Sequence, residues 1–218
     1  MKKMPIPVVQ RLTKYLVYVQ DICKEDIVWV SSNEIAQALS LTSSTVRQDL
    51  SHLEISGISK RGYETAILQR VLCRELGADK TVNAVIVGAG NLGRALALHG
   101  EFGRRGFGIC AIFDSNTDLI GEKIEGIEIS SMEKLKEIVK KRKIDIGMIA
   151  VPASAAQSVA DLLVSAGVKG LLNLTLSHVC PAGNAVVVDT RIIANLQELL
   201  YLMRAKDSIG SGVSARKT

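Results

Sequence analysis

Residues 83–98 read NAVIVGAGNLGRALAL, and this stretch decides the fold of the larger part of the chain. An apolar run typical of a buried strand leads directly into a G-x-G-x-x-G loop and then into a helical pattern. Gly88 permits the tight turn, Gly90 lets the backbone approach a pyrophosphate, and Gly93 lets the helix pack against the strand. The stretch predicts a dinucleotide-binding loop formed by Gly88, Ala89, Gly90, Asn91, Leu92 and Gly93.

A carboxylate ends the next apolar run, about 20 residues beyond the loop, where it can accept hydrogen bonds from both ribose hydroxyls. This residue is Asp114, and no arginine follows it in the segment Ser115-Asn116-Thr117-Asp118. A 2′-phosphate would therefore meet uncompensated negative charge. The sequence favours NAD and NADH over NADP as the cofactor.

Beyond residue 80, short apolar runs alternate with helical stretches, which predicts an α/β fold with a Rossmann-type parallel sheet. The ends of parallel strands face the ligand crevice of such a sheet. From position alone, Pro152 can also be a first-turn helical residue and Asn173 a loop cap. The strand-end candidates for the cofactor site are Val151, Pro152, Ala153, Asn173 and Thr175.

The first 80 residues have another pattern, with apolar residues at helical spacing and short polar connections. Ser31 and its neighbours can cap a helix over residues 34–39. After the turn 40–42, a second helix is expected from Ser43 to about Ile55. Another helix should end where Gly77 can adopt a left-handed conformation. This half predicts a helix-turn-helix.

The outer face of the second helix carries short hydroxyls and long donors, which can contact phosphates and read base edges in the major groove. Gly57 and Gly62 bracket a short basic hairpin, so the layout is that of a winged helix. A helix pair of this kind can also serve only packing or a dimer surface. The candidate DNA-binding residues are Ser43, Ser44, Thr45, Arg47 and Gln48 in the helix, and Lys60, Arg61, Gly62 and Tyr63 in the wing.

The composition excludes several classes of protein. The chain has 218 residues, of which 47% are apolar and 22% charged, so it is not a disordered polyelectrolyte. Its four cysteines form no C-x-x-C pair, which argues against a metal site and a disulfide framework. No apolar stretch long enough for a signal peptide or a membrane span is present, so we expect a cytoplasmic protein with no membrane association. The net charge of +5 and an acid-free segment 1–20 are compatible with nucleic-acid binding.

Catalysis is the weaker interpretation. An oxidoreductase needs a proton donor or acceptor near the nicotinamide. No tyrosine is followed four residues later by lysine, and neither His99 nor His178 has an obvious carboxylate beside it. We therefore expect no enzyme. The alternatives are a small NAD-dependent oxidoreductase with a helical dimerisation domain, and a repressor that responds to another nucleotide such as coenzyme A.

Taken in order, these motifs resemble the Rex family of redox-sensing transcriptional repressors over nearly the whole chain. The resemblance implies a homodimer that exchanges a C-terminal helix, here about Ile192 to Lys206. It also implies a double-stranded, palindromic DNA operator that the protein leaves when NADH replaces NAD. The matching pieces are Ile6-Pro7, Arg11 to Leu16, Val46 to Ser51, Lys60 to Tyr63, Gly88 to Gly93, Phe113-Asp114, Ala150 to Ala153, and Gly167 to Asn173.

The resemblance also indicates where this chain differs from the family. His99 stands where the family usually has tyrosine, and both Asp189 and Arg191 lie near the aspartate that precedes the family's C-terminal helix. Segment 52–59 lacks the family's aromatic, glycine-rich character. The expected organisation is a winged-helix domain over 1–80, a Rossmann domain over 81–190, a dimerisation helix over 191–206 and a disordered tail over 207–218.

Overall fold

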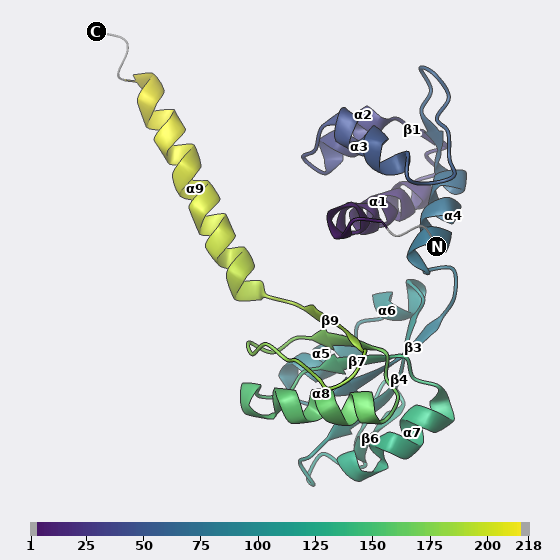
Figure 1. Cartoon of the computed structure of the whole chain (residues 1–218), viewed down its shortest axis with the longest axis vertical. Coiled ribbons are helices and arrows are strands. Elements are labelled where there is room, and N and C mark those ends of the chain that lie inside the picture. Colours follow the sequence, from purple (N-terminus) through teal and green to yellow (C-terminus); the bar gives the residue numbers. More distant parts are fainter. Residues whose placement is uncertain (1–3, 215–218) are drawn as a thin grey trace. The chain divides into compact units, whose positions relative to one another are not determined.

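The computed structural model describes residues 4–214, with side chains over residues 4–206. The chain divides into two compact units, Met1–Thr81 and Val82–Thr218. Figure 1 shows the helical first unit and the sheet-containing second unit.

From residue 4 onward, the N-terminal unit consists of four helices and a two-stranded antiparallel sheet. Its apolar residues recur at helical spacing, and they bury Leu12, Ile35, Val46 and Leu68 in one core. The helices are α1 (Ile6–Lys24), α2 (Ser32–Ala38), α3 (Ser43–Leu50) and α4 (Thr65–Leu76), and the strands are β1 (Trp29–Val30) and β2 (Tyr63–Glu64).

Local signals set most helix ends in this unit. The Ser31 hydroxyl accepts a hydrogen bond from the Glu34 N–H at 3.2 Å, and the Glu34 carboxylate accepts one from the Ser31 N–H at 2.7 Å, which completes a capping box. Gly77 ends α4 with φ of 70°, so the expectation of a left-handed cap is confirmed.

The predicted end of α3 at about Ile55 is wrong, because the helix stops at Leu50. The N–H groups of His52 and Leu53 bond back only three residues, to Asp49 and Leu50, so the chain tightens into a turn. This turn returns Leu53 to the core, where it is buried. The helical spacing of apolar residues continues along the sequence, but the turn allows Leu53 to be buried and ends the helix earlier.

The second unit is built on a seven-stranded sheet in the order β5-β6-β4-β3-β7-β8-β9. All neighbouring strands are parallel except β5 and β6, so the predicted Rossmann-type fold is confirmed. The sequence had not indicated β5 or β6. The strands are β3 (Val82–Val87), β4 (Phe107–Asp114), β5 (Lys123–Ile124), β6 (Ile127–Ser131), β7 (Ile146–Ile149), β8 (Gly170–Asn173) and β9 (Val186–Asp189).

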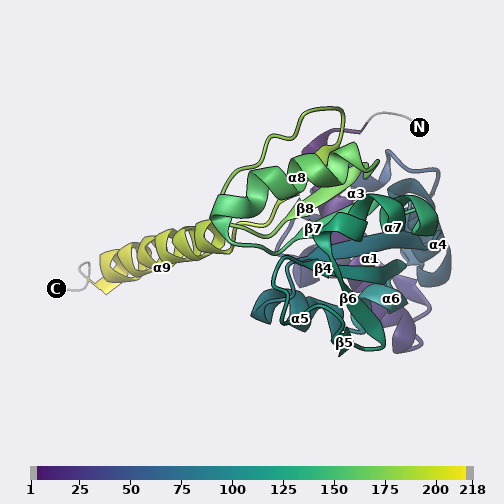
Figure 2. The same ribbon diagram turned by 90° about the horizontal axis from the view of Figure 1, so that it is seen from below.

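Helices cover the two faces of this sheet unequally. Figure 2 shows α7 and α8 on one face and α5 and α6 on the other. On the side of α5 and α6, strand β9 leaves Val186 and Val188 exposed at 67% and 57%. The helices are α5 (Asn91–Ala97), α6 (Glu101–Arg104), α7 (Leu135–Arg142) and α8 (Ala156–Ser165), with single 3₁₀ turns over Met132–Lys134 and Ala153–Ala155.

The last helix, α9, runs from Ile192 to Ser214. It extends past the expected end at Lys206, so residues 207–214 are helical where a disordered tail was expected. Gly210 and Gly212 each cost a helix about 1 kcal/mol, but no proline interrupts the segment. The remainder of the expected tail, 215–218, lies outside the described residues.

Candidate functional site

The glycine loop lies where the strand order reverses, between the carboxyl ends of β3 and β7. Gly88 has φ of 105°, and a Cβ there would meet the carbonyl of Ala150. A Cβ on Gly93 would meet the carbonyl of Gly88, so both glycines are required for close packing. A Cβ on Gly90 would meet nothing within 4 Å. Packing therefore does not require a glycine at position 90, whereas an approaching ligand would.

A cavity of about 430 Å³ opens beside this loop. Gly88, Gly90, Asp114, Val151 and Pro152 all line it, so the fold brings together residues from three separate predicted segments. The remaining lining has two sources. Some residues are direct neighbours of the predicted ones, and the others belong to α8 and the 3₁₀ turns, which the sequence had not indicated because they reach the cavity only through packing on the sheet. These additional residues are Val87, Ser115, Met132, Ala150, Ala155, Ser158, Val159 and Leu162.

Asp114 is tied to the glycine loop. One carboxylate oxygen accepts a hydrogen bond from the N–H of Ala89 at 2.6 Å, and the other accepts one from the N–H of Asn116 at 2.8 Å. The carboxylate is thereby held at the cavity wall next to the loop. This is the position that selection of a ribose with two free hydroxyls requires.

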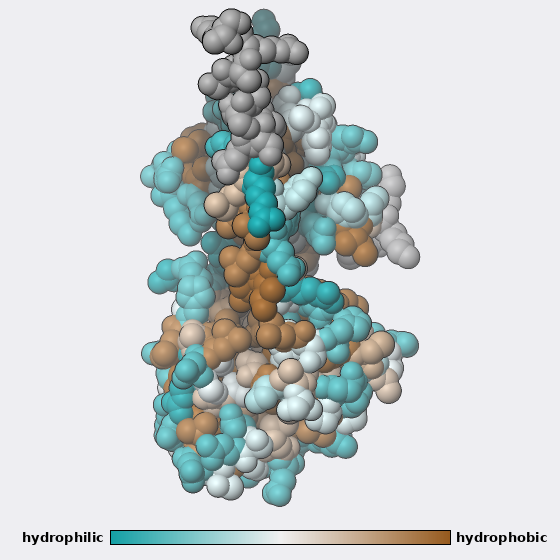
Figure 3. Space-filling model, turned by 90° about the vertical axis from the view of Figure 1, so that its left-hand side faces the viewer, coloured by the Kyte–Doolittle hydropathy of each residue, from teal (hydrophilic) through white to brown (hydrophobic). Residues whose placement is uncertain are grey.

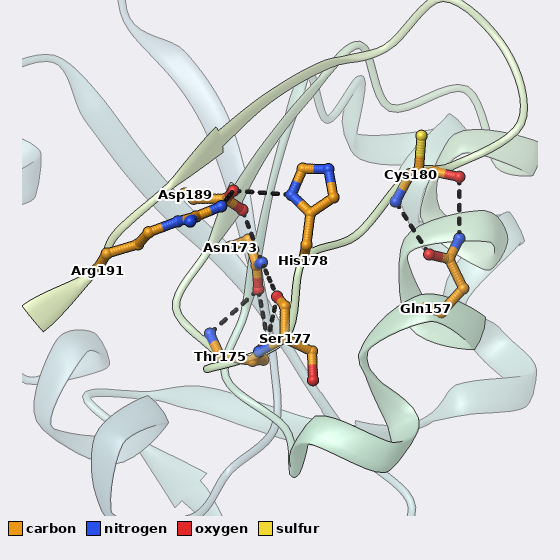
Figure 4. A network of polar contacts seen from close by, with 8 residues as sticks. All are labelled: Gln157, Asn173, Thr175, Ser177, His178, Cys180, Asp189 and Arg191. Atoms are coloured by element: carbon orange, nitrogen blue, oxygen red, sulfur yellow. Dashed lines mark hydrogen bonds and ion pairs between the residues drawn. The ribbon is translucent and has the colours of Figure 1, made fainter. Parts of the chain in front are cut away.

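Asn173 and Thr175 belong to a different polar cluster, drawn in Figure 4. Asn173 is completely buried and donates to the carbonyl of Ser177 at 2.7 Å and to Asp189 at 2.8 Å. Its oxygen accepts from the N–H and the hydroxyl of Thr175, at 3.1 and 2.8 Å. Both ends of the Asn173 side-chain amide thus form hydrogen bonds within the protein, which supports its interpretation as a loop cap.

Asp189, at the end of β9, joins this cluster to the start of α9. Hydrogen bonds from Arg191 at 2.9 Å and from Asn173 lower the pKa of Asp189 to about 2. His178 Nδ1 lies 3.1 Å from the same carboxylate, a partner that could not be foreseen from the residues next to this histidine in the chain. Asn173, His178 and Arg191, from three segments, therefore all contact the carboxylate of Asp189 shortly before α9 begins.

In the N-terminal unit, Ser43, Ser44 and Thr45 begin α3, and Arg47 and Gln48 lie one turn later. Thr42, the last residue of the predicted turn, is the N-cap, and its hydroxyl accepts a hydrogen bond from the N–H of Thr45 at 3.2 Å. Ser44 and Thr45 also exchange hydroxyl hydrogen bonds with Thr42. Arg47 is exposed and donates to the hydroxyl of Ser32 at 3.3 Å. Ser43 and Gln48 lie on the same short helix, and Gln48 is exposed.

The predicted wing is a tight hairpin closed by a bridge between Ile58 and Gly62. Lys60, at its tip, is exposed and has φ of 64°. Gly62 has φ of 91°, and a Cβ there would meet the carbonyl of Val30. Tyr63 starts β2 and is half-buried, with its ring beside Gly57. Gly62 therefore allows the wing to lie close to β1, and Gly57 leaves room for the Tyr63 ring.

One buried carboxylate, which the sequence pattern does not single out, anchors α3. Asp49 accepts hydrogen bonds from Arg11 Nε at 2.6 Å, Arg11 Nη2 at 2.7 Å and the Tyr15 hydroxyl at 2.6 Å. Burial opposes ionisation of Asp49, but these donors outweigh it and hold the pKa below its ordinary value. The network links α1 to the C-terminal half of α3. Its only signal in the sequence is an aspartate at a core-facing position of an otherwise amphipathic helix.

Within the described part of the chain, no helix has the length and apolar content needed to traverse a bilayer. The side chains described over residues 4–206 also include no group of three or more His, Cys, Asp or Glu placed to hold a metal ion.

Comparisons with known proteins cover both units. Residues 3–51 match the family model described as a putative DNA-binding protein N-terminus, and residues 79–177 match the model described as a CoA binding domain. The redox-sensing transcriptional repressor Rex of Caldicellulosiruptor bescii is 38% identical over 94% of both chains. The Rex protein of Carboxydothermus hydrogenoformans is 39% identical over 93% of this chain and 97% of its own length.

Solved structures of RSP, a Rex-family repressor, are similar over the full length. The RSP complex with β-NADH has a TM-score of 0.86 and 32% identity, covering 97% of this chain and 99% of RSP. The RSP complex with β-NAD⁺ and operator DNA also has a TM-score of 0.86, with 31% identity over 100% of both chains.

Proposed function

The chain belongs to the Rex family of redox-sensing transcriptional repressors, and with this membership as premise we propose which of its own residues carry out repression and sensing. It is a DNA-binding repressor that responds to NADH and NAD, and its relatives are named as repressors, not as enzymes. The assignment of the site rests on one observation: the space over Gly90 is open, and it lies beside the cavity that Asp114 lines.

The dinucleotide would be held by loop residues Gly88 to Gly93, with Asp114 accepting hydrogen bonds from the adenosine ribose. Val151, Pro152 and Ala153 would face it from the end of β7. Asn173 and Thr175 would act indirectly, by holding the adjacent loop. The bound group supplies a nicotinamide ring that is charged when oxidised and neutral when reduced, and the repressor has to distinguish these two forms.

The operator would be contacted by two surfaces of the N-terminal unit. Ser43, Ser44 and Thr45 stand at the start of α3, where short hydroxyls and helix N–H groups suit phosphate oxygens. Arg47 and Gln48, one turn later, have the two-pronged donors that read purine edges in the major groove. Lys60 and Arg61 would bring the positive charge of the wing to the backbone, with Gly62 and Tyr63 supporting its shape.

We propose that the active form is a homodimer that exchanges α9. Within one chain, the described part of this helix exposes apolar side chains on all sides. A helix of this kind is normally buried, so another surface is expected to cover it. Figure 3 shows hydrophobic side chains along α9 and around its base on the sheet unit. The exposed residues are Ile192, Ile193, Leu196, Leu199, Leu200, Tyr201, Leu202 and Met203.

The face of the sheet that α5 and α6 cover only in part offers a complementary surface. A cavity of about 350 Å³ lies there, with an almost entirely apolar lining that includes Phe102, Met148, Leu172 and Val188. A partner's α9 would cover such a surface in an exchanged dimer. Two-fold symmetry would then place two copies of α3 on a palindromic operator, with half-sites about 34–36 Å apart or a multiple of this.

Sensing requires only that NADH and NAD favour different arrangements of the two DNA-binding units. A ligand shifts such an equilibrium by its differential affinity for the two states, so a difference of a few kcal/mol is sufficient. We propose that NADH favours the arrangement that cannot hold both half-sites, and that the protein acts in the cytoplasm.

The test is a titration of operator binding by the full-length protein with NAD, NADH, NADP and coenzyme A in parallel. We expect NADH to dissociate the complex at concentrations at which NAD does not. Equal effects of NADH and NAD would refute redox sensing while leaving a nucleotide-responsive repressor.

Coenzyme A is the second candidate ligand, because residues 79–177 match a model with that description. Its adenosine carries a 3′-phosphate, which would approach the Asp114 carboxylate and be repelled. We therefore expect coenzyme A to leave operator binding unchanged. Dissociation by coenzyme A alone would make it the effector.

A further inference from the structure

A cation stands directly beside the glycine loop. Arg94, in the middle of α5, donates from Nε to the carbonyl of Ala89 at 3.0 Å. The N–H of the same residue, Ala89, donates to Asp114. One residue of the loop therefore connects the guanidinium of Arg94 with the carboxylate that faces the ribose. In nucleotide sites of this fold, an arginine near that carboxylate is the group that accommodates a 2′-phosphate.

The guanidinium already has a carboxylate partner. Arg94 Nη2 lies 2.5 Å from Oε2 of Glu122, while its Nε holds the loop carbonyl. Both side chains keep contact with solvent, with exposed fractions of 35% and 47%. An ion pair exposed to this degree contributes little to the stability of the fold. Its more important consequence is that Glu122 neutralises the positive charge of Arg94 near the ribose site.

The backbone fixes Glu122 in this position. Its N–H donates to the carbonyl of Leu119 at 3.1 Å, and its carbonyl accepts from the N–H of Ile129 at 2.8 Å. The segment from Asp114 to Glu122 is therefore a folded loop, and the carboxylates at its two ends both return to the glycine loop region. Asp114 reaches the N–H of Ala89, and Glu122 reaches the arginine that binds the carbonyl of Ala89.

We propose that Glu122 is a second determinant of cofactor selectivity: it keeps Arg94 paired and so denies a 2′-phosphate the cation that binds the glycine loop. The inference rests on the proposed dinucleotide site. Asp114 would repel the 2′-phosphate directly. Glu122 would act by pairing with Arg94, the cation that could otherwise bind the phosphate. Selectivity for NADH over NADPH therefore depends on a residue outside the cavity lining as well as on Asp114.

The experiment measures Kd values of NADH and NADPH for the full-length protein by calorimetry. Glu122→Gln should tighten NADPH binding about 5- to 10-fold, which is the scale of one charge-assisted hydrogen bond at a partly exposed site. NADH binding should change less than about 2-fold. The double variant Arg94→Gln/Glu122→Gln should lose the gain, because the freed cation is then absent.

Glu128→Gln is the matched control, because it removes the same charge from β6 of the same hairpin but outside the pair with Arg94. An equal gain for NADPH in Glu128→Gln, an unchanged Kd for NADPH in Glu122→Gln, or a gain that persists in the double variant would each overturn the inference. Glu122→Thr provides a second neutral replacement if Glu122→Gln unfolds. If the unmodified protein binds neither NADH nor NAD, it is the proposed function that fails.

Discussion

The guanidinium carbon of Arg61 lies 4.1 Å from the centroid of the Trp29 ring, which joins the wing to β1 by a cation–π contact. The sequence places Arg61 beside Lys60 as a second basic contact to DNA. In the structure the two differ, because Lys60 is at the exposed tip whereas Arg61 rests on the chain's single tryptophan. Arg61 therefore has a part in holding the wing as well as in supplying charge.

Replacement of Lys60 and of Trp29 should separate these two roles. Lys60→Ala should weaken binding to all DNA sequences and reduce the salt slope of log K by about 1, because one phosphate contact is lost. Trp29→Ala should weaken operator binding although all positive charges remain, because Arg61 loses its support. Fluorescence anisotropy at several salt concentrations measures both effects. Operator binding by Trp29→Ala equal to that of the unmodified protein would show that the stack does not position the wing.

Arg47→Ala tests base reading by α3. We expect a loss of about 1–3 kcal/mol in specific binding, because Arg47 is exposed and can pair with a purine edge. The difference between operator and scrambled DNA should shrink, and NADH affinity should not change. A gel-shift titration with both DNAs measures this. Unaltered discrimination between the DNAs would remove Arg47 from the set of base-reading residues.

The glycines of the loop should respond differently to substitution. Gly90→Val should fold normally and lose NADH binding, since its side chain would enter open space that the ligand needs. Gly93→Val should destabilise the unit, because its Cβ would meet the carbonyl of Gly88. Thermal unfolding and calorimetry on both variants distinguish the two effects. Tight NADH binding by Gly90→Val would contradict the proposed path of the pyrophosphate.

Asp49→Asn should destabilise the N-terminal unit by about 2–4 kcal/mol, because Arg11 loses its charged partner. Tyr15→Phe is the matched control, since it removes one of the three hydrogen bonds to Asp49 and should cost about 1 kcal/mol. Urea unfolding followed by circular dichroism measures both.

The same carboxylate predicts how stability depends on pH. The pKa of Asp49 in the folded protein lies below its ordinary value of about 3.9, so the stabilisation is fully present above that value. It is lost as the pH falls through the lower folded pKa. Asp49→Asn should therefore show a smaller loss of stability than the unmodified protein on acidification below about pH 4. Parallel acid-unfolding curves for the two proteins would contradict this role.

Leu199→Asp should test the exchanged dimer. Leu199 lies on α9 with 52% of its surface exposed, and a charge there would have to be buried when a partner covers the helix. We expect dissociation to monomers and loss of operator binding, with NADH binding retained because one chain supplies the residues that line the cavity. Glu198→Gln is the control on the same helix. Sedimentation velocity gives the oligomeric state, and a stable dimer of the Leu199→Asp variant would exclude α9 as the interface.

The sequence by itself determined the features that depend only on residues close to one another in the chain. The glycine loop, Asp114 at the end of its strand, the helix cap at Ser31 and the left-handed Gly77 all follow from the residues next to them in the chain. Their backbone requirements are local, so the order of residues is sufficient to predict them. The same reasoning led to the winged helix and the parallel sheet, because hydrophobic periodicity reports which face each element buries.

Only the tertiary structure decided the roles of residues whose partners are distant in the chain. Asn173 turned out to be held by Asp189 and Ser177, Asp49 by Arg11, and Arg94 by Glu122, while α8 supplied part of the cavity wall. A hydrogen bond or ion pair depends on ångström-scale distances between side chains, and periodicity sets only which face a residue occupies. Packing of the helices on the sheet sets those distances, and so decides which polar groups are already paired and which remain available to a ligand.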